Sequence, residues 1–316
     1  MHSRKMKSCV LICLALCGFM SGLAAEQLVE NPAEWEAGPV VGAALDKAQF
    51  RWWAPAGAQK LTGVIVLIPG RNGDGRALAD DPAWQQIATS LNVGLMGCFL
   101  YGEKDFFKYQ SDPTGDVAKT INDAVEKLAL QNGFKDMKRT PLVFWGHSAG
   151  ACVNEVYASR FPERVAAVIN LKGPRGAGSL VPGKEDIPFL IIVGKNDKPD
   201  WVKSAVDSFD AAQRKNSSWT LAVQPSEGHE QGNSLDLIRA YLQAVIPLRI
   251  GLPPIGTPTS TSSRPRKLVR TQGWLGDPET YEASSYAAFT GKKRSAIWLP
   301  NEATALAWQS FLRSTP

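Results

Sequence analysis

The sequence predicts an α/β fold built on a mostly parallel β-sheet, and three observations predict it. Short apolar runs alternate with longer segments of helical period from about residue 48 to residue 246. Several of these runs are apolar throughout, as expected for strands covered on both faces of a parallel sheet. The chain also has 316 residues, 44% of them hydrophobic, which is sufficient for one large domain with a substantial core.

The predicted strands are short runs bounded by glycine, proline or polar residues. Central strands are expected at 63–70 ("GVIVLIPG"), 141–146 ("PLVFWG"), 164–171 and 187–194. Further strands are expected at 92–100 and 218–224, and an edge strand at 48–55.

The predicted helices lie between these strands. The first, at 81–91, has Asp81 as its N-cap and Pro82 in its first turn, which is a typical start signal. The others are expected at 114–133, 149–161, 200–215 and 233–246.

The N-terminus is typical of a secretory signal peptide. Three basic residues precede the apolar run 9–20, and small residues for cleavage follow near Ala24 or Ala25. The alternative, a retained transmembrane anchor, needs about 20 apolar residues, more than this run provides. We therefore expect residues 1–25 to be removed from a secreted or periplasmic protein that has no stable membrane anchor.

Charge and cysteine content exclude several classes of protein. Loss of residues 1–25 removes three basic and no acidic residues, which lowers the net charge from +5 to +2. A nearly neutral chain argues against nucleic-acid binding. The remaining cysteines, Cys98 and Cys152, lie in apolar segments where free thiols are common, although a disulfide between them stays open. The sequence has no C-x-x-C and no H-E-x-x-H motif, so no metal site is expected.

The C-terminal part of the chain has a different composition. Residues 251–266 are rich in Pro, Thr, Ser and Gly without apolar periodicity, which is typical of a linker. Residues 267–316 contain three tryptophans and a predicted helix at 301–312. About fifty residues rarely form a core of their own, so we expect this extension to pack on the main domain. A flexible tail or a separate binding module is the alternative.

The stretch "GHSAG" contains a candidate nucleophile, Ser148. A predicted buried strand at 141–146 leads into it, and a predicted helix follows it. This strand–turn–helix context is that of a nucleophile elbow. Glycines on both sides of Ser148 would leave room for the sharp turn.

A nucleophilic serine needs a general base, and the histidine count limits the choice. Of the three histidines, His2 lies in the signal peptide and His147 is interpreted as a structural residue of the turn. This leaves His229, in the loop that follows a predicted strand. Asp197, just after the predicted strand 187–194, is the expected acid. Asp200 and Asp186 are the competing acids.

The oxyanion of an acyl-transfer reaction needs two hydrogen-bond donors. We expect the backbone amide of Ala149, directly after the nucleophile, to be one of them. The second is expected in the loop "IPGRNGDGR", as the amide of Arg71, with Asn72 as the alternative. The glycine spacing of this loop fits neither a dinucleotide-binding motif nor a P-loop, so no nucleotide cofactor is predicted.

Taken together, the "PGRNGDG" loop, the "GHSAG" elbow, the "GKND" turn and the "EGHE" loop resemble the α/β-hydrolase superfamily. They are similar to secreted feruloyl esterases and polyhydroxybutyrate depolymerase-like serine esterases. The resemblance implies a catalytic domain at 26–250 whose mostly parallel sheet is flanked by helices. The short segment 172–186, where many relatives insert a lid, implies an open cleft.

The predicted function is hydrolysis of carboxylic esters through an acyl-enzyme, without a cofactor. Its substrate partners would be small or polymeric esters, such as acyl or feruloyl esters of polysaccharides or hydroxyacid polyesters. A serine peptidase, and a non-catalytic carbohydrate-binding or interaction protein on a decayed hydrolase fold, are the alternatives. Aromatic residues that either line the cleft or belong to the core are Trp84, Tyr101, Phe106, Phe107, Trp145 and Trp201.

Overall fold

The computed structural model describes residues 33–103, 106–173, 184–251 and 264–314. The predicted signal peptide, and all of the predicted linker except residue 251 and residues 264–266, lie outside these ranges. In the described ranges, none of the helices combines the length and apolar character needed to cross a bilayer.

An eight-stranded sheet forms the centre of the fold, with the strand order β1-β2-β4-β3-β5-β6-β7-β8. β2 pairs antiparallel with β1 and with β4, and the other neighbouring strands of this sheet are parallel. The strands are β1 Glu34–Glu36, β2 Lys47–Trp53, β3 Gly63–Ile68, β4 Val93–Tyr101, β5 Leu142–His147, β6 Val165–Leu171, β7 Phe189–Gly194 and β8 Thr220–Gln224.

All the predicted strands of this sheet are present, and one of them occupies a different place from the one expected. β2, the predicted edge strand, lies second from the edge because Glu34–Glu36 pair with Gln49–Arg51. The three residues of β1 contain no apolar run that would predict a strand. Its pairing with β2 is a tertiary contact.

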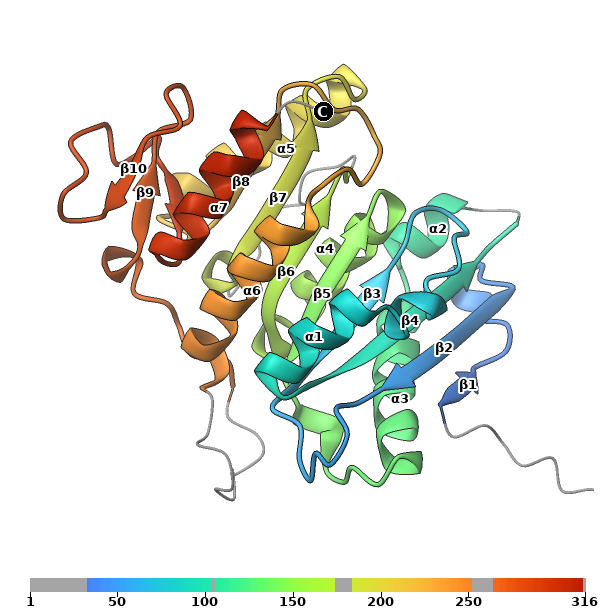
Figure 1. The fold of residues 1–316 in the computed structure, drawn as a ribbon. Helices are drawn as coiled ribbons and strands as arrows, with labels where there is room; N and C mark the ends of the chain where they lie inside the picture. The colour runs from blue at the N-terminus through green and yellow to red at the C-terminus, as the bar shows by residue number, and fades with distance from the viewer. Residues whose placement is uncertain (1–32, 104–105, 174–183, 252–263, 315–316) are drawn as a thin grey trace, which may run out of the picture. The chain divides into compact units, whose positions relative to one another are not determined.

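Helices cover both faces of the sheet (Figure 1). The helices are α1 Pro82–Leu91, α2 Phe106–Ser111, α3 Asp116–Gln131, α4 Ala149–Arg160, α5 Pro199–Gln213, α6 Leu235–Ile250 and α7 Glu302–Arg313. α1, α6 and α7 lie side by side on one face, and α3 and α4 lie on the other. Short 3-10 helices occupy Val41–Ala43, Arg76–Ala79, Met137–Arg139, Pro162–Arg164, Lys184–Asp186 and Arg270–Gln272.

Local signals explain where α1 begins and ends. The Asp81 carboxylate accepts a hydrogen bond from the amide of Ala83 at 2.7 Å, and Pro82 occupies the first turn. Asn92 ends the helix in the left-handed conformation, with φ of 51°. Asp81 and Pro82 are the signals that predicted this helix.

α6 extends beyond its predicted end and contains Pro247 in its last turn. Arg249 explains this continuation. Its buried guanidinium donates to the carbonyls of Ala166 and Val165 at 2.9 and 3.0 Å, which ties the turn to the start of β6. A tertiary anchor therefore overrides the local tendency of proline to end a helix.

The described part of the predicted C-terminal extension, residues 267–314, packs on the main domain as predicted. It contains a three-stranded antiparallel sheet in the order β10-β9-β11, formed by Ala283–Ser285, Trp274–Gly276 and Ile297–Leu299. Trp308 of α7 donates to the carbonyl of Leu221 in β8 at 2.8 Å, and the Thr220 hydroxyl donates to the carbonyl of Trp298 at 2.6 Å.

The hydrophobic core runs through both parts of the chain. Trp308 and Phe311 of α7 belong to the same buried cluster as the strands of the large sheet, whereas Trp298 joins a smaller cluster within the extension. Trp274 is only partly buried. No disulfide joins Cys98 and Cys152 in the part of the chain that the structure describes, and Cys98 is fully buried while Cys152 is partly exposed.

Candidate active site

Ser148 lies at a sharp turn between β5 and α4, as the motif predicts. Its backbone has φ of 53° and ψ of −114°, a strained conformation for a residue with a side chain. Its amide donates to the carbonyl of Leu171 at 2.9 Å, which ties the turn to the end of β6. Such strain at a sharp turn is a feature of functional sites.

The glycines on both sides of Ser148 are required by space. A Cβ atom on Gly146 would lie 2.5 Å from the carbonyl carbon of Gly150, and one on Gly150 would lie 2.1 Å from the carbonyl oxygen of Ile68. Both distances are far below van der Waals contact. The two glycines therefore allow β3, β5 and α4 to approach one another at this turn.

The structure brings Ser148, His229 and Asp197 together in one hydrogen-bonded chain. His229 Nε2 lies 2.8 Å from Ser148 Oγ, and His229 Nδ1 lies 2.8 Å from Asp197 Oδ2. Because a carboxylate only accepts, Nδ1 carries the proton and donates to Asp197, which leaves Nε2 free to accept from the serine hydroxyl. The side chain of Asp197 is 5% exposed and that of His229 is 38% exposed.

The competing acids lie elsewhere. Asp186 forms an ion pair with Lys267 at 2.6 Å. Asp200 is exposed in the first turn of α5, and the N-cap of that helix makes no side-chain hydrogen bond. The other oxygen of Asp197 accepts from the amide of Lys198 at 2.7 Å, which fixes the carboxylate.

The loops after β7 and β8 hold Asp197 and His229 against each other. The amide of Asn196 donates to the carbonyl of Glu227 at 2.9 Å, and its side chain donates to the carbonyl of Ser226 at 3.2 Å. A Cβ atom on Gly194 would lie 2.2 Å from the carbonyl oxygen of Gly228, so only glycine permits this close approach. Asp197 and His229 are thus positioned as one unit.

A buried lysine adds positive charge behind these loops. Lys172, directly after β6, is 1% exposed, and its ammonium lies 3.3 Å from the amide oxygen of Gln224. Burial lowers the pKa of Lys172, and the negative charges of Glu227, Glu230 and Asp197 act in the opposite direction.

A buried ion pair ties α4, the helix that follows Ser148, to its neighbours. The Glu155 carboxylate, in α4, accepts from the ammonium of Lys184 at 2.5 Å and from the side-chain amide of Asn170 in β6 at 2.8 Å. The side chains of Lys184 and Glu155 are 0% and 8% exposed. Buried charges of this kind are stable only when both partners are present.

Of the two predicted oxyanion donors, Ala149 lies at the elbow and Arg71 follows a residue that approaches it, and the role of both stays a prediction. Ala149 is the first residue of α4, where helix amides have no partner within the helix. Gly70, the neighbour of Arg71, approaches so closely that its Cβ would lie 3.5 Å from the Cβ of Ser148. The alternative, Asn72, uses its side chain to accept from and donate to Gly102, which ties the loop to the end of β4.

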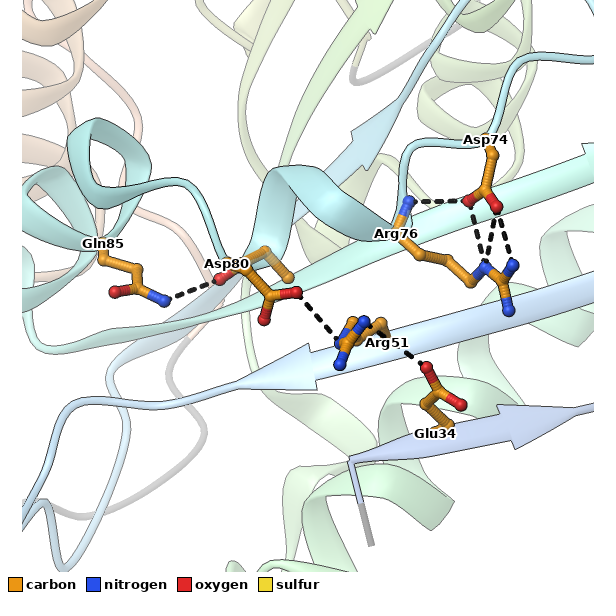
Figure 2. A network of polar contacts seen from close by, with 7 residues as sticks. Glu34, Arg51, Asp74, Arg76, Asp80 and Gln85 are labelled. Carbon is orange, nitrogen blue, oxygen red and sulfur yellow. Dashed lines mark hydrogen bonds and ion pairs between the residues drawn. The ribbon is translucent and has the colours of Figure 1, made fainter. Parts of the chain in front are cut away.

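Polar contacts join the end of the loop 68–76, and the chain that follows it, to neighbouring elements (Figure 2). The Asp74 carboxylate accepts from the guanidinium of Arg76 at 2.9 and 2.6 Å, and this interaction lowers the pKa of Asp74. Arg51 of β2 lies between Asp80 and Glu34, at 3.2 and 3.6 Å, which joins the 3-10 helix after the loop to β1. Gln85 of α1 donates to the carbonyl of Ala79 at 3.1 Å.

Among the aromatic residues considered from the sequence, Trp201 contacts the base. Its ring centroid lies 5.1 Å from that of His229, and the ammonium of Lys198 lies 4.1 Å from the Trp201 centroid. Trp84 and Trp145 are buried against each other and belong to the core. Tyr101 packs against Phe99, and the side chains of Phe106 and Phe107 are outside the described residues. The sequence offered no signal that separated Trp201 from these residues.

Taken as a whole, the topology decides the fold class. Eight strands form a mostly parallel sheet, helices cover both faces, and the serine, acid and histidine follow β5, β7 and β8 in that chain order. The chain has the α/β-hydrolase fold. The residues of this hydrolase fold that the structure describes contain no cluster of three or more His, Cys, Asp or Glu that could hold a metal ion.

Comparison with known proteins gives structural matches only. No family model and no curated protein matches this sequence. The chain is similar to FphF, a fluorophosphonate-binding serine hydrolase of Staphylococcus aureus, with 13% identity over 67% of this chain and 97% of that one and a TM-score of 0.49. It is also similar to a ferulic acid esterase (10% identity, 67% and 96% covered, TM-score 0.49). For esterase PE8 the values are 19% identity, 61% and 97% covered, and a TM-score of 0.47.

Proposed function

We propose that this hydrolase-fold protein is a serine esterase that cleaves carboxylic esters through an acyl-enzyme. The observation that carries the proposal is the chain from Ser148 Oγ through His229 to Asp197, with both contacts at 2.8 Å. These distances lie within the range required for proton transfer to a general base. The order of donor and acceptor atoms along the chain is that required of a nucleophile, a base and an orienting acid.

In the proposed first half-reaction, Ser148 Oγ attacks the ester carbonyl carbon as its proton passes to His229 Nε2. Asp197 stabilises the imidazolium through its hydrogen bond from Nδ1. The amides of Ala149 and Arg71 would hold the negatively charged oxygen. The carbon–oxygen bond to the alcohol then breaks, and His229 returns the proton to the leaving alcohol.

In the second half-reaction, water attacks the acyl-enzyme and gives its proton to His229. The acid leaves, and Ser148 recovers its proton.

For the substrate, we propose acyl or feruloyl esters of polysaccharides, or hydroxyacid polyesters. Exposure of 38% of the His229 side chain supports an open site that admits a polymer chain. The partly exposed Trp201 ring beside His229 offers an apolar surface for an aromatic or aliphatic group. We also propose export of the chain, which N-terminal sequencing of the processed protein would test.

A fluorophosphonate probe followed by a panel of substrates tests the proposal. The purified protein should be labelled at Ser148, and Ser148→Ala should not be labelled. The panel contains acetyl, butyryl and feruloyl esters, a hydroxybutyrate oligomer and a peptide amide. Hydrolysis of an ester supports the proposal, and cleavage of the amide alone favours a peptidase. Absence of both labelling and hydrolysis favours a binding protein.

A further inference from the structure

His147, the last residue of β5, contacts the main chain of the proposed base. Its Nε2 lies 2.9 Å from the carbonyl oxygen of His229. Because a carbonyl oxygen only accepts, Nε2 of His147 carries a proton and donates it. The two imidazole rings lie 5.2 Å apart between centroids.

The other side of the His147 ring faces the loop after β3. A Cβ atom on Gly70 would lie 3.4 Å from His147 Nδ1, so the ring is packed between this loop and the loop of His229. Burial lowers the pKa of His147, which keeps its ring neutral and avoids a second positive charge beside His229.

The base itself is on an exposed segment that needs such a contact. His229 lies between β8 and α6 in a loop without regular structure, and its side chain is 38% exposed. Neighbouring residues in the loop are held by other contacts, such as the 2.6 Å bond from the amide of Gly228 to Glu230. The bond from His147 acts on the carbonyl of His229, at the residue that must stay within 2.8 Å of Ser148.

We propose that His147 is a positioning residue, whose Nε2 hydrogen bond to the His229 carbonyl holds the base in line with Ser148. The inference rests on the proposed function for its kinetic consequence, although the anchoring itself does not. A displacement of about 1 Å at a reacting group lowers rates by roughly 100-fold. Loss of this hydrogen bond should therefore lower the rate by an amount that steady-state kinetics can measure.

Two amide substitutions at this position form a matched pair. The amide nitrogen of His147→Gln reaches the place of Nε2, whereas the shorter side chain of His147→Asn reaches only the place of Nδ1. We expect His147→Asn to lower kcat roughly 10- to 100-fold with KM changed less than about twofold. His147→Gln should recover most of this loss, and thermal unfolding should be similar in the two variants. If His147→Asn does not fold, His147→Ser takes its place, since its hydroxyl is also too short.

Equal kcat in the two variants would overturn the proposal, because it would reduce His147 to a space-filling residue. Hydrogen exchange of the 225–232 backbone gives a second readout that needs no substrate. Faster exchange in His147→Asn than in His147→Gln and the natural protein supports anchoring, and equal exchange in all three refutes it. Failure of the natural protein to react with a fluorophosphonate would instead refute the esterase proposal, and the exchange experiment would still decide the role of His147.

Discussion

The site around Ser148 and the C-terminal extension are built in opposite ways. At the site, a serine holds φ of 53°, and a histidine with 38% of its side chain exposed bridges it to a carboxylate. In the extension, α7 has a regular cap, in which Asn301 accepts from the amide of Thr304 at 2.9 Å, and it buries Trp308 to 1% exposure. The extension follows local rules of helix formation, whereas the site departs from them.

The difference separates residues that contribute to function from residues that contribute to stability. Strained backbone and exposed polar side chains at one place are usually retained for function, and locally consistent packing is retained for stability. Substitutions at the site should therefore change activity more than stability, and substitutions in the extension should do the reverse. Four predictions test this division, from the largest expected effect to the smallest.

Removal of the nucleophile or the base should have the largest effect. Ser148→Ala and His229→Ala should each lower kcat about 10³-fold or more, and Asp197→Asn should leave a measurable remainder. The losses should not add in the double variants, because the three groups act as one unit. Steady-state kinetics check the effect, and unchanged thermal unfolding is the control. Near-normal hydrolysis by His229→Ala would contradict the assignment of the base.

Truncation of the buried tryptophan in the extension should act on stability alone. Trp308→Ala should lower the free energy of unfolding by about 3–5 kcal/mol, since it creates a cavity and removes the bond to the carbonyl of Leu221. The matched control is Leu306→Ala on the exposed side of the same helix, with an expected change within about 0.5 kcal/mol. Denaturant unfolding measures both.

A lower kcat of Trp308→Ala, at a temperature where the variant is fully folded, would contradict the division between a site that acts on activity and an extension that acts on stability. Removal of residues 255–316 extends the test. The truncated chain should aggregate or unfold at a lower temperature, because the faces of β8 and α6 that the extension covers become exposed. An unchanged melting temperature would mean that the extension is an independent appendage.

The buried ion pair of Glu155 with Lys184 tests whether contacts next to the site contribute to the stability of the fold. Glu155→Gln should destabilise the fold by about 3 kcal/mol, because it leaves the buried ammonium of Lys184 without a counter-charge. The double variant Glu155→Gln with Lys184→Met removes both charges and should recover part of this loss. Urea unfolding distinguishes the two, and equal destabilisation in both would argue against an unpaired charge as the cause.

The smallest of the four effects should be a loss of unfolding free energy on acidification that depends on His147. Burial depresses the pKa of its imidazole in the folded state below the ordinary value of 6.5, and the hydrogen bond to the His229 carbonyl opposes this shift. The nearby charges of His229 and Lys172 lower the pKa further, and that of Asp197 raises it. The unfolded chain then binds the proton more tightly than the folded one. The resulting stability is complete above pH 6.5 and decreases as the pH falls through the lower folded-state value.

Urea unfolding of the natural protein and His147→Gln between pH 5 and 8 measures this contribution. The difference in unfolding free energy between the two proteins should change below about pH 6.5, with the natural protein losing more. A pH-independent difference would show that His147 does not titrate differently in the two states.

Several features could be predicted from the sequence because short stretches of chain determine them. The apolar run at 63–70 has the pattern of a strand buried on both faces of a parallel sheet, and Asp81 with Pro82 begins a helix through contacts within its own first turn. The turn at Ser148 is likewise marked in the sequence, because a glycine stands two residues before it and another two residues after it. Elimination then led to His229, since the chain has so few histidines. The structure places it against Ser148 across 81 residues of sequence.

Other features are decided only when distant segments meet. β1, β9, β10 and β11 are three residues long, and their identity depends on pairing with a neighbour. The contact of Trp201 with His229, the bond from His147 to the carbonyl of His229, and the ion pair of Glu155 with Lys184 join segments 28 to 82 residues apart. The sequence alone determined the alternation of strands and helices and the candidate nucleophile, base and acid. Tertiary structure decided which side chains surround them, because orientation and burial result from packing between elements and leave no periodic signal along the chain.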